Sequence, residues 1–318
     1  MSVDMDPGGG SQVGRRLAWT SLACVLAMLA VYALFAGTKF GHELDAYAYF
    51  GRDLALHRVI RFDDQILGAV TKGTLALLVV MVFVVALVRR VPLVGFIAVA
   101  GVSVAIVGAE LLKLILPWHA LIPLDALYAG GLVNASFPSG HTTIGTSVPL
   151  AFVLVSSARW RPWLAAFAGL ISASYATGVV FAGWHRPSDA IGGVLWATAC
   201  LFSAAWLAWF ARGRSAPVRN PTAKRGPLMF SLVLAAMVLA VALAGAFFDA
   251  DGLPDLDASF VVTVSLIVGT AFGLSAWFGQ SLRSIDWARA SDSAATVQAV
   301  QPELHRNPGD TSGMPRPS

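Results

Sequence analysis

Two short segments carry the residues whose types and spacing could do chemistry. They are Phe137-Pro138-Ser139-Gly140-His141 and, later in the chain, Trp184-His185-Arg186-Pro187-Ser188-Asp189. Each lies where a long apolar run begins or ends. An ionisable group at bilayer depth costs at least about 2.5–3.5 kcal/mol. Two histidines and an aspartate at the edge of such runs therefore indicate a functional site.

The second segment predicts an oriented imidazole. His185 and Asp189 are four residues apart, and a helix that begins at Pro187 would start between them. Asp189 could then accept a hydrogen bond from one imidazole nitrogen, which leaves the other nitrogen available as a nucleophile. The alternative is a His-Asp pair that serves only to cap the helix.

The first segment predicts an anion site. Ser139-Gly140 at a helix start leaves backbone N–H groups unpaired, and the helix dipole there also favours an anion. His141 would stand one residue into the helix, within reach of the bound anion. The alternative is an ordinary Ser N-cap beside an incidental His. Lys113 near the end of an earlier apolar run could add a cation, although it could equally pair with Glu110, three residues before it.

These motifs resemble those of the type 2 phosphatidic acid phosphatase superfamily, integral-membrane lipid phosphatases related to vanadium haloperoxidases. That family carries Lys-x6-Arg-Pro, Pro-Ser-Gly-His and Ser-Arg-x5-His-x3-Asp. The second motif is intact at 138–141, the third retains His185 and Asp189, and the first retains Lys113. The motifs cover residues 113–189, and the similarity in span arrangement extends over roughly 17–211.

The resemblance implies a role for each residue and no metal or cofactor. His185 would attack phosphorus and form a phosphohistidine, Asp189 would orient it, and His141 would protonate the leaving oxygen. The phosphate oxygens would be held by Lys113, Ser139 and the Gly140 N–H. The site would then act through positioning and charge stabilisation.

The chain departs from the family pattern at two arginines. Ala120-Leu121 stands in place of the Arg-Pro of the first motif, and Gly178-Val179 in place of the Ser-Arg of the third. Each charged hydrogen bond lost is worth about 1.5–3 kcal/mol. Arg186 could substitute as a substrate-binding residue, or it could bind lipid headgroups or cap a helix.

The composition is that of a polytopic membrane protein. The 318 residues are 57% hydrophobic and 13% charged, with a mean hydropathy of +0.70, whereas soluble domains carry about 25% charged residues. The net charge of +4 does not indicate a nucleic-acid partner, because the basic residues are spread over many short loops. Cys24 and Cys200 lie in apolar runs, which favours small apolar side chains over a disulfide. The excess of Arg over Lys, with abundant Ala, Val and Gly, suggests a bacterial origin.

We expect an all-α polytopic bundle of about eight transmembrane helices, with a six-helix core over 15–212, a cytoplasmic basic loop over 213–226 and two further spans over 227–280. Residues 1–14 and 281–318 are predicted to be disordered tails. Arg15-Arg16 before the first run resembles a signal peptide, but the run is long and no Ala-x-Ala site follows, so a retained helix is favoured. Segment 37–69 is predicted to hold an interfacial amphipathic helix. The predicted spans are 17–36, 70–88, 91–116, 141–158, 163–182, 190–211, 227–247 and 259–280.

The positive-inside rule gives an orientation. With both termini in the cytoplasm of a plasma-membrane protein, most of the basic residues face inward, and the acidic loop from Asp249 to Asp257 faces outward. Both signature segments then lie on the extracytoplasmic face.

The leading hypothesis is therefore a phosphatase that hydrolyses a lipid phosphate or diphosphate at the outer face of the membrane, with membrane lipids as its surroundings. One alternative is a phosphotransferase on the same site, since both reactions share the covalent intermediate. Another is a degenerate family member that binds lipids without catalysis, as the two absent arginines suggest. A haloperoxidase is disfavoured, because the resemblance implies an arginine-rich vanadate pocket for that branch.

Overall fold

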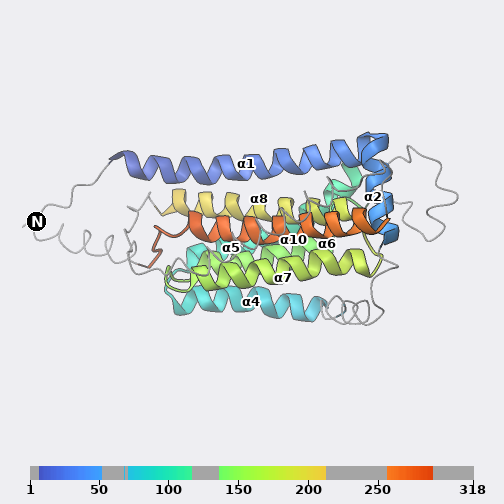
Figure 1. Ribbon diagram of the computed structural model, residues 1–318. Helices are drawn as coiled ribbons and strands as arrows, with labels where there is room; N and C mark the ends of the chain where they lie inside the picture. The colour runs from blue at the N-terminus through green and yellow to red at the C-terminus, as the bar shows by residue number, and fades with distance from the viewer. Residues whose placement is uncertain (1–6, 52–67, 69–70, 117–135, 213–255, 289–318) are drawn as a thin grey trace, which may run out of the picture.

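A computed structural model describes residues 7–51, 68, 71–116, 136–212 and 256–288 (Figure 1). Within these ranges every regular element is an α-helix, which confirms the predicted all-α bundle. The helices are α1 (Pro7–Gly37), α2 (Lys39–Gly51), α4 (Lys72–Val88), α5 (Pro92–Ile115), α6 (Gly140–Val155), α7 (Arg161–Phe181), α8 (Pro187–Ala211) and α10 (Leu256–Ser281).

Seven of the predicted spans coincide with helices, and the span 227–247 lies outside the described residues. Five of the helices are long and apolar enough to cross a bilayer: α1 from Gln12, α5, α7, α8 and α10 from Ser259. Two others, α4 and α6, are apolar but shorter, with lengths of about 25 Å at 1.5 Å per residue. The described helices therefore fit a polytopic membrane bundle.

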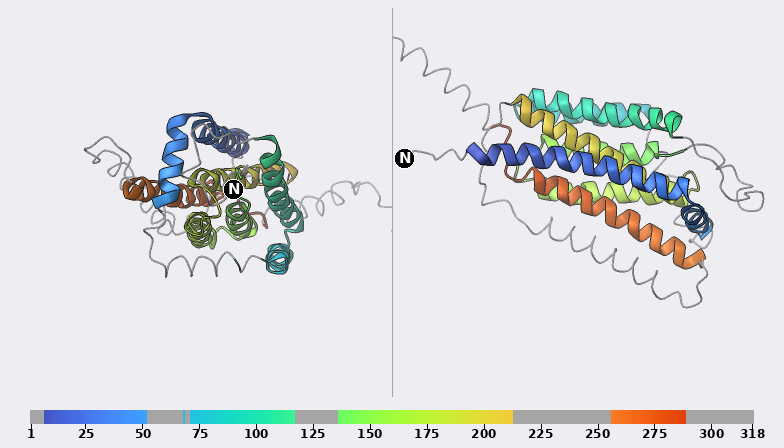
Figure 2. Two further views of the ribbon diagram at one scale, coloured as in Figure 1. Left: turned by 90° about the vertical axis from the view of Figure 1, so that its right-hand side faces the viewer. Right: turned by 90° about the horizontal axis from the view of Figure 1, so that it is seen from above.

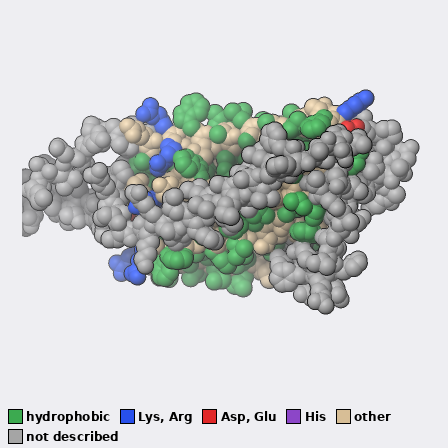
Figure 3. All heavy atoms as spheres, in the orientation of Figure 1, with side chains coloured by type: hydrophobic (Ala, Val, Ile, Leu, Met, Phe, Trp, Pro, Cys, Tyr) green, Lys and Arg blue, Asp and Glu red, His purple; other side chains and the backbone are tan. Residues whose placement is uncertain are grey.

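The central helix is α8, which packs against α1, α5, α6, α7 and α10. Small residues let its neighbours approach closely. A Cβ added to Gly101 of α5 would lie 2.8 Å from the Cβ of Ala204, and Trp196 Nε1 of α8 donates a hydrogen bond of 2.8 Å to the Ala105 carbonyl of α5. Close packing through small residues is typical of helices in a membrane. On the outer faces, large apolar side chains are exposed (green in Figure 3).

Helix α2 lies across one end of the bundle rather than along it (Figures 1 and 2). It packs against α1 and α10 and also touches α8. His42, Asp45 and Tyr49 are buried on its inner face, whereas Phe40 and Glu43 are exposed. A helix in the predicted segment is confirmed over Lys39–Gly51, and its interfacial position stays a prediction. Residues 52–67 and 69 of that segment lie outside the described residues.

The N-terminal helix begins earlier than the sequence predicts. The segment 1–14 was expected to be a disordered tail, but α1 already begins at Pro7. The reason is tertiary packing close to α8: Val13 and Leu17 are buried, and a Cβ added to Gly14 would lie 3.2 Å from Trp209 Cδ1. Gly14, in a segment whose glycines suggest flexibility in the sequence, is here a point of close helix contact.

The predicted disorder of 281–318 is wrong for its first eight residues. Beyond the end of α10, Leu282, Ile285 and Trp287 are buried in the core, and Trp287 Nε1 donates to the Leu154 carbonyl at 2.9 Å. The polar residues between them hide this apolar set in the sequence. Residues 282–288, called here the C-terminal clasp, thus close the end of the bundle opposite α2.

Four arginines hold the clasp and the end of α10. Arg16 Nη2 donates to the Ser281 carbonyl at 2.7 Å, and Arg212 Nη2 to the Trp287 carbonyl at 3.1 Å. Arg161 is buried and donates to the carbonyls of Leu282, at 2.5 Å, and Ile285. Arg89 forms an ion pair with Asp286, at 3.8 Å. These contacts give the carbonyl groups of the non-helical backbone hydrogen-bond donors, and in Arg161 the Nη1 atom makes both bonds.

Replacing Trp287 with Ala should destabilise the bundle by about 3–5 kcal/mol, because a large buried side chain and its hydrogen bond are lost. Thermal unfolding of the purified protein in detergent measures this as a lower Tm. The matched control is Trp160→Ala, since Trp160 is 58% exposed at the same end. Equal Tm values for the two variants would show that the clasp does not stabilise the fold.

Candidate active site

The two signature segments meet at the α2 end of the bundle. The backbone N–H of Ser139, which precedes α6, donates to the Asp189 carbonyl in the first turn of α8 at 2.9 Å. Two glycines of α8 make this approach possible: a Cβ on Gly193 would lie 2.8 Å from the Ser139 carbonyl oxygen, and one on Gly192 would lie 2.4 Å from the Phe137 ring. The N-termini of α6 and α8 are thereby fixed side by side.

His185 faces Asp189 as the spacing predicted. The Nδ1 atom of His185 lies 3.4 Å from Asp189 Oδ2. Asp189 is 1% exposed, and its Oδ2 also accepts hydrogen bonds from the Arg186 N–H at 3.1 Å and from Ser136 Oγ. The carboxylate is therefore held by several donors, and Nδ1 is the ring nitrogen of His185 that faces it, with Nε2 on the other side of the ring.

The loop that carries His185 is held from α7 as well. The Val179 carbonyl accepts hydrogen bonds from the backbone N–H groups of Trp184, at 2.9 Å, and His185, at 3.1 Å. Gly183 has a φ of 71°, a conformation that glycine adopts without strain. Gly178 and Val179, where the family has Ser-Arg, are buried in α7.

His141 lies at the start of α6, within electrostatic reach of His185, Lys113 and Glu110. Its ring makes an edge contact with Trp184, with centroids 5.2 Å apart. The structure thus brings the two histidines from different segments to one place.

Lys113 and Gly140 are also neighbours, as expected for two parts of one anion site. A Cβ added to Gly140 would lie 2.9 Å from Glu110 Oε1 and 3.5 Å from Lys113 Nζ. Lys113 pairs with Glu110 at 2.8 Å, which confirms the alternative raised from their spacing. Ser139 is buried, and its Oγ accepts the Thr142 N–H at 3.4 Å as an N-cap.

Arg186 is 2% exposed, and its charge acts on Asp189 and on two residues of α2, Asp45 and His42. Its guanidinium is therefore enclosed among side chains of the protein. Lys113, which is 22% exposed, is the more accessible cation of the two.

Sequence reasoning missed Asp45. This residue of α2 is 3% exposed, and its two oxygens accept hydrogen bonds from the N–H of Ser188, at 3.0 Å, and from Ser188 Oγ, at 2.6 Å. Burial and the charge of Asp189 raise the pKa of Asp45 to about 7, against the opposite effects of the Ser188 hydrogen bonds and of Arg186. Burial and the charge of Arg186 also lower the pKa of His42.

A signal for these residues exists in the sequence. His42, Asp45 and Tyr49 are three and four residues apart, which places them on one face of a helix. Ionisable residues on the face opposite an exposed Glu43 suggest burial against a polar partner. Their partner in α8, more than a hundred residues away, could not be read from that pattern.

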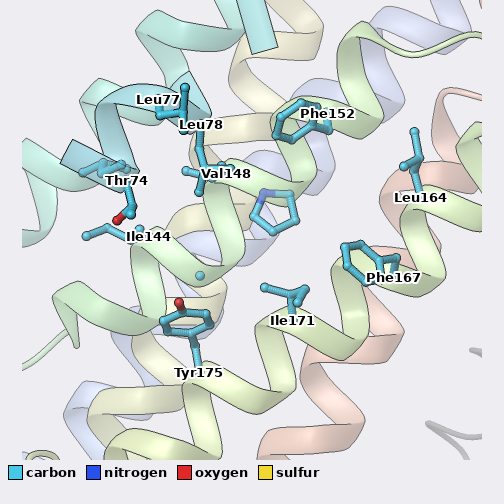
Figure 4. Close-up of a pocket in the computed structure, with 13 residues that line it drawn as sticks. Thr74, Leu77, Leu78, Ile144, Val148, Phe152, Leu164, Phe167, Ile171 and Tyr175 are labelled. Atoms are coloured by element: carbon cyan, nitrogen blue, oxygen red, sulfur yellow. The ribbon is translucent and has the colours of Figure 1, made fainter. Parts of the chain in front are cut away.

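An apolar cavity of about 580 Å³ opens between α4, α6 and α7 (Figure 4). Along α6 it runs from Ile144, about one turn after His141, to Phe152, a distance of about 12 Å. Its other walls include Leu78 of α4 and Ile171 of α7. An apolar channel thus begins next to the polar site.

Comparisons with known proteins agree with the motifs. Residues 92–214 match the sequence model of the PAP2 superfamily, which confirms the resemblance and suggests phosphatase activity. No curated protein and no solved structure gives a significant match. The matched range includes all the predicted site residues, from Lys113 to Asp189.

Gly193→Ala should separate the two signature segments. The added methyl group would meet the Ser139 backbone at 2.8 Å and Thr142 at 3.0 Å, and such overpacking costs about 1–3 kcal/mol. A lower Tm is expected, whereas Gly37→Ala, with open space around its Cβ, should leave the Tm within a degree or two of the wild-type value. A Gly193→Ala protein as stable as the wild type would argue against the tight contact between α6 and α8.

Proposed function

We propose, from the match of residues 92–214 to the PAP2 superfamily, that this protein hydrolyses a lipid phosphate or diphosphate through a phosphohistidine at the outer face of the plasma membrane. The observation that carries the proposal is the His185–Asp189 pair, at 3.4 Å, beside the N-terminus of α6. No other pair of described residues joins an oriented imidazole to an anion-binding helix end.

In the proposed first step, His185 Nε2 attacks phosphorus, a P–N bond forms and the bond from phosphorus to the leaving oxygen breaks. His141, on the other side of the bound phosphate, donates the proton that the leaving oxygen needs. In the second step water attacks the phosphorus of the phosphohistidine, a P–O bond forms, and the P–N bond breaks to release phosphate and restore His185. His141 is the base that accepts the proton of the water. Asp189 stabilises the positive charge that develops on His185.

The phosphate is proposed to lie at the N-terminus of α6. Backbone N–H groups and the helix dipole favour an anion at this position, and the Gly140 backbone can approach closely because it has no side chain. Lys113, close to Gly140, supplies a cation. Charge stabilisation of this kind is the main catalytic contribution in phosphoryl transfer.

A lipid substrate is supported by the apolar cavity. It begins about one helical turn from His141 along α6, and its walls come from α4, α6 and α7. A lipid with its phosphate at the α6 N-terminus could lay its tail along Ile144, Val148 and Phe152. Burial of such a chain contributes about 0.8 kcal/mol per CH₂ group.

The side of the membrane is proposed from the distribution of charge. Arg89, Arg161 and Arg212 lie at the clasp end, and the blue side chains visible in Figure 3 gather mainly at that end. Under the positive-inside rule the clasp end is cytoplasmic. The site, at the α2 end, then faces outward.

The test of the reaction is phosphate release by the purified protein from a panel of polyprenyl diphosphates, phosphatidic acid and phosphatidylglycerol phosphate. His185→Ala should reduce turnover at least 10³-fold, and Asp189→Asn about 10²–10⁴-fold, because the nucleophile or its orientation is lost. The His185→Ala protein should also form no acid-labile phosphoenzyme. Full activity of His185→Ala would refute the mechanism, and lipid binding without turnover by the wild type would favour the non-catalytic alternative.

The proposed tail site has its own test. Ile171→Trp should fill part of the cavity and lower kcat/KM for long-chain substrates about tenfold, while a short-chain phosphate ester reacts as before. Val104→Trp is the control, since Val104 lines a different groove between α1, α5 and α8. Equal effects of the two variants on long-chain substrates would refute the tail site.

A further inference from the structure

Helix α2 contacts the segment 183–188, which comprises the loop before α8 and the first residues of α8, at both of its ends. Tyr49 Oη donates to the Gly183 carbonyl at 3.0 Å, and Asp45 accepts both hydrogen bonds of Ser188. Residues 183 and 188 flank His185. Asp45 and Tyr49 are one helical turn apart on the same face of α2, so one rigid element contacts both ends of the segment that carries the nucleophile.

The contact at Ser188 is well built. Asp45 and Ser188 are 3% and 5% exposed, and Asp45 caps the first turn of α8, where backbone N–H groups have no partner within the helix. Asp189 occupies the next position in that turn. Movement of Ser188 therefore moves the carboxylate that orients His185.

Asp45 also contributes charge. Arg186, which precedes α8, interacts with both Asp45 and Asp189. When Asp45 is ionised, the Arg186 guanidinium interacts with two carboxylates, those of Asp45 and Asp189. Its attraction for Asp189 is then weaker. Without that charge, Arg186 competes with His185 for Asp189.

We propose that α2 is a positioning element for the proposed reaction, with Asp45 as the residue that holds the first turn of α8 and balances Arg186. This inference rests on the proposed function of the site. It assigns a role to a residue outside the three sequence motifs, in a helix that lies across the bundle end. Asp45 does not touch the substrate and acts through Ser188 and Arg186.

The charge gives the proposal a pH signature. Because the pKa of Asp45 is raised to about 7, its carboxyl group is protonated and neutral well below pH 7. It loses its proton and becomes a charged carboxylate as the pH rises through 7. Among the described residues, the other charged groups at this site are His42 on α2, Arg186 and Asp189 around α8, and His141, Lys113 and Glu110 around His185. The described side chains of α10, over 259–281, add no ionisable group here.

The experiment compares Asp45→Asn with Glu43→Gln over pH 5.5–8.5. Both changes remove one carboxylate from α2, but Glu43 is exposed. For Asp45→Asn, kcat should be about tenfold below the wild type at pH 8.5 and within twofold of it at pH 5.5, with KM unchanged, because loss of orientation affects the chemical step. Glu43→Gln should match the wild type throughout.

Two further variants separate the charge from the hydrogen bonds. Tyr49→Phe keeps both Asp45 and Ser188 and should lower kcat by a factor that does not change with pH. Ser188→Ala removes a hydrogen bond that lowers the pKa of Asp45, so the factor by which it lowers kcat should change with pH. A ratio of wild-type to Asp45→Asn activity that stays constant over this range would overturn the role of the charge. A smaller folded fraction of the variant would change this ratio by the same factor at every pH, so it would not alter how the ratio varies with pH.

Amide hydrogen exchange tests the inference without relying on turnover. In Asp45→Ala, the Ser188 amide loses its acceptor and should exchange at least tenfold faster than in the wild type, while amides in the middle of α8 stay protected. Unchanged exchange would overturn the positioning role. If the wild type releases no phosphate from any lipid, the proposed function fails, and this measurement still decides whether α2 holds the loop.

Discussion

The site depends on the burial of one carboxylate. Asp189 is almost inaccessible to solvent, and a buried charge costs several kcal/mol unless hydrogen bonds and opposite charges surround it. Its partners come from two segments. Ser136 belongs to the segment before α6, and Arg186 and His185 belong to the loop before α8. Satisfying Asp189 therefore requires these segments to converge, and their convergence is what creates the proposed catalytic geometry.

The same constraint organises the other end of the bundle. Arg161 is buried at the start of α7, and its Nη1 atom donates to two carbonyl groups of the clasp. A guanidinium offers five donors and remains charged at any physiological pH, so it can be buried only where acceptors are held in place. The clasp binds arginines that follow or belong to α4, α7 and α8, and the last residue of α10 binds an arginine of α1. In a membrane, the long apolar faces of these helices gain no hydrophobic energy from packing against each other instead of lipid. Polar contacts at the two ends of the bundle thus fix which helices are neighbours.

The sequence predicted the elements well and their long-range contacts poorly. His141, His185 and Asp189 stood out because ionisable residues are rare beside apolar runs, and the structure does bring them together. Asp45 was missed because its significance depends on α2 lying across α8, which no local spacing reveals. The clasp was missed for a similar reason: Leu282, Ile285 and Trp287 are separated by polar residues, and the arginines that hold them are distant in the sequence. The first turns of α1 were missed likewise, because the glycines there have low helix propensity and the contact of Gly14 with Trp209 of α8 joins residues far apart in the sequence.

The absence of the two family arginines gives the remaining cations different roles in the proposed reaction. Arg186 is enclosed with Asp45 and Asp189, so much of its charge is balanced within the protein. Lys113 is paired with Glu110, which is 62% exposed, and an exposed pair of this kind is worth only about 0–1 kcal/mol. Glu110 can therefore turn toward water at little cost when a phosphate arrives, and Lys113 can exchange one anionic partner for another. In the proposed reaction one cation, Arg186, lies among the groups around His185, and the other, Lys113, binds the substrate. The backbone N–H groups at the start of α6 then supply part of the anion binding for which the PAP2 motifs that this chain resembles use arginines.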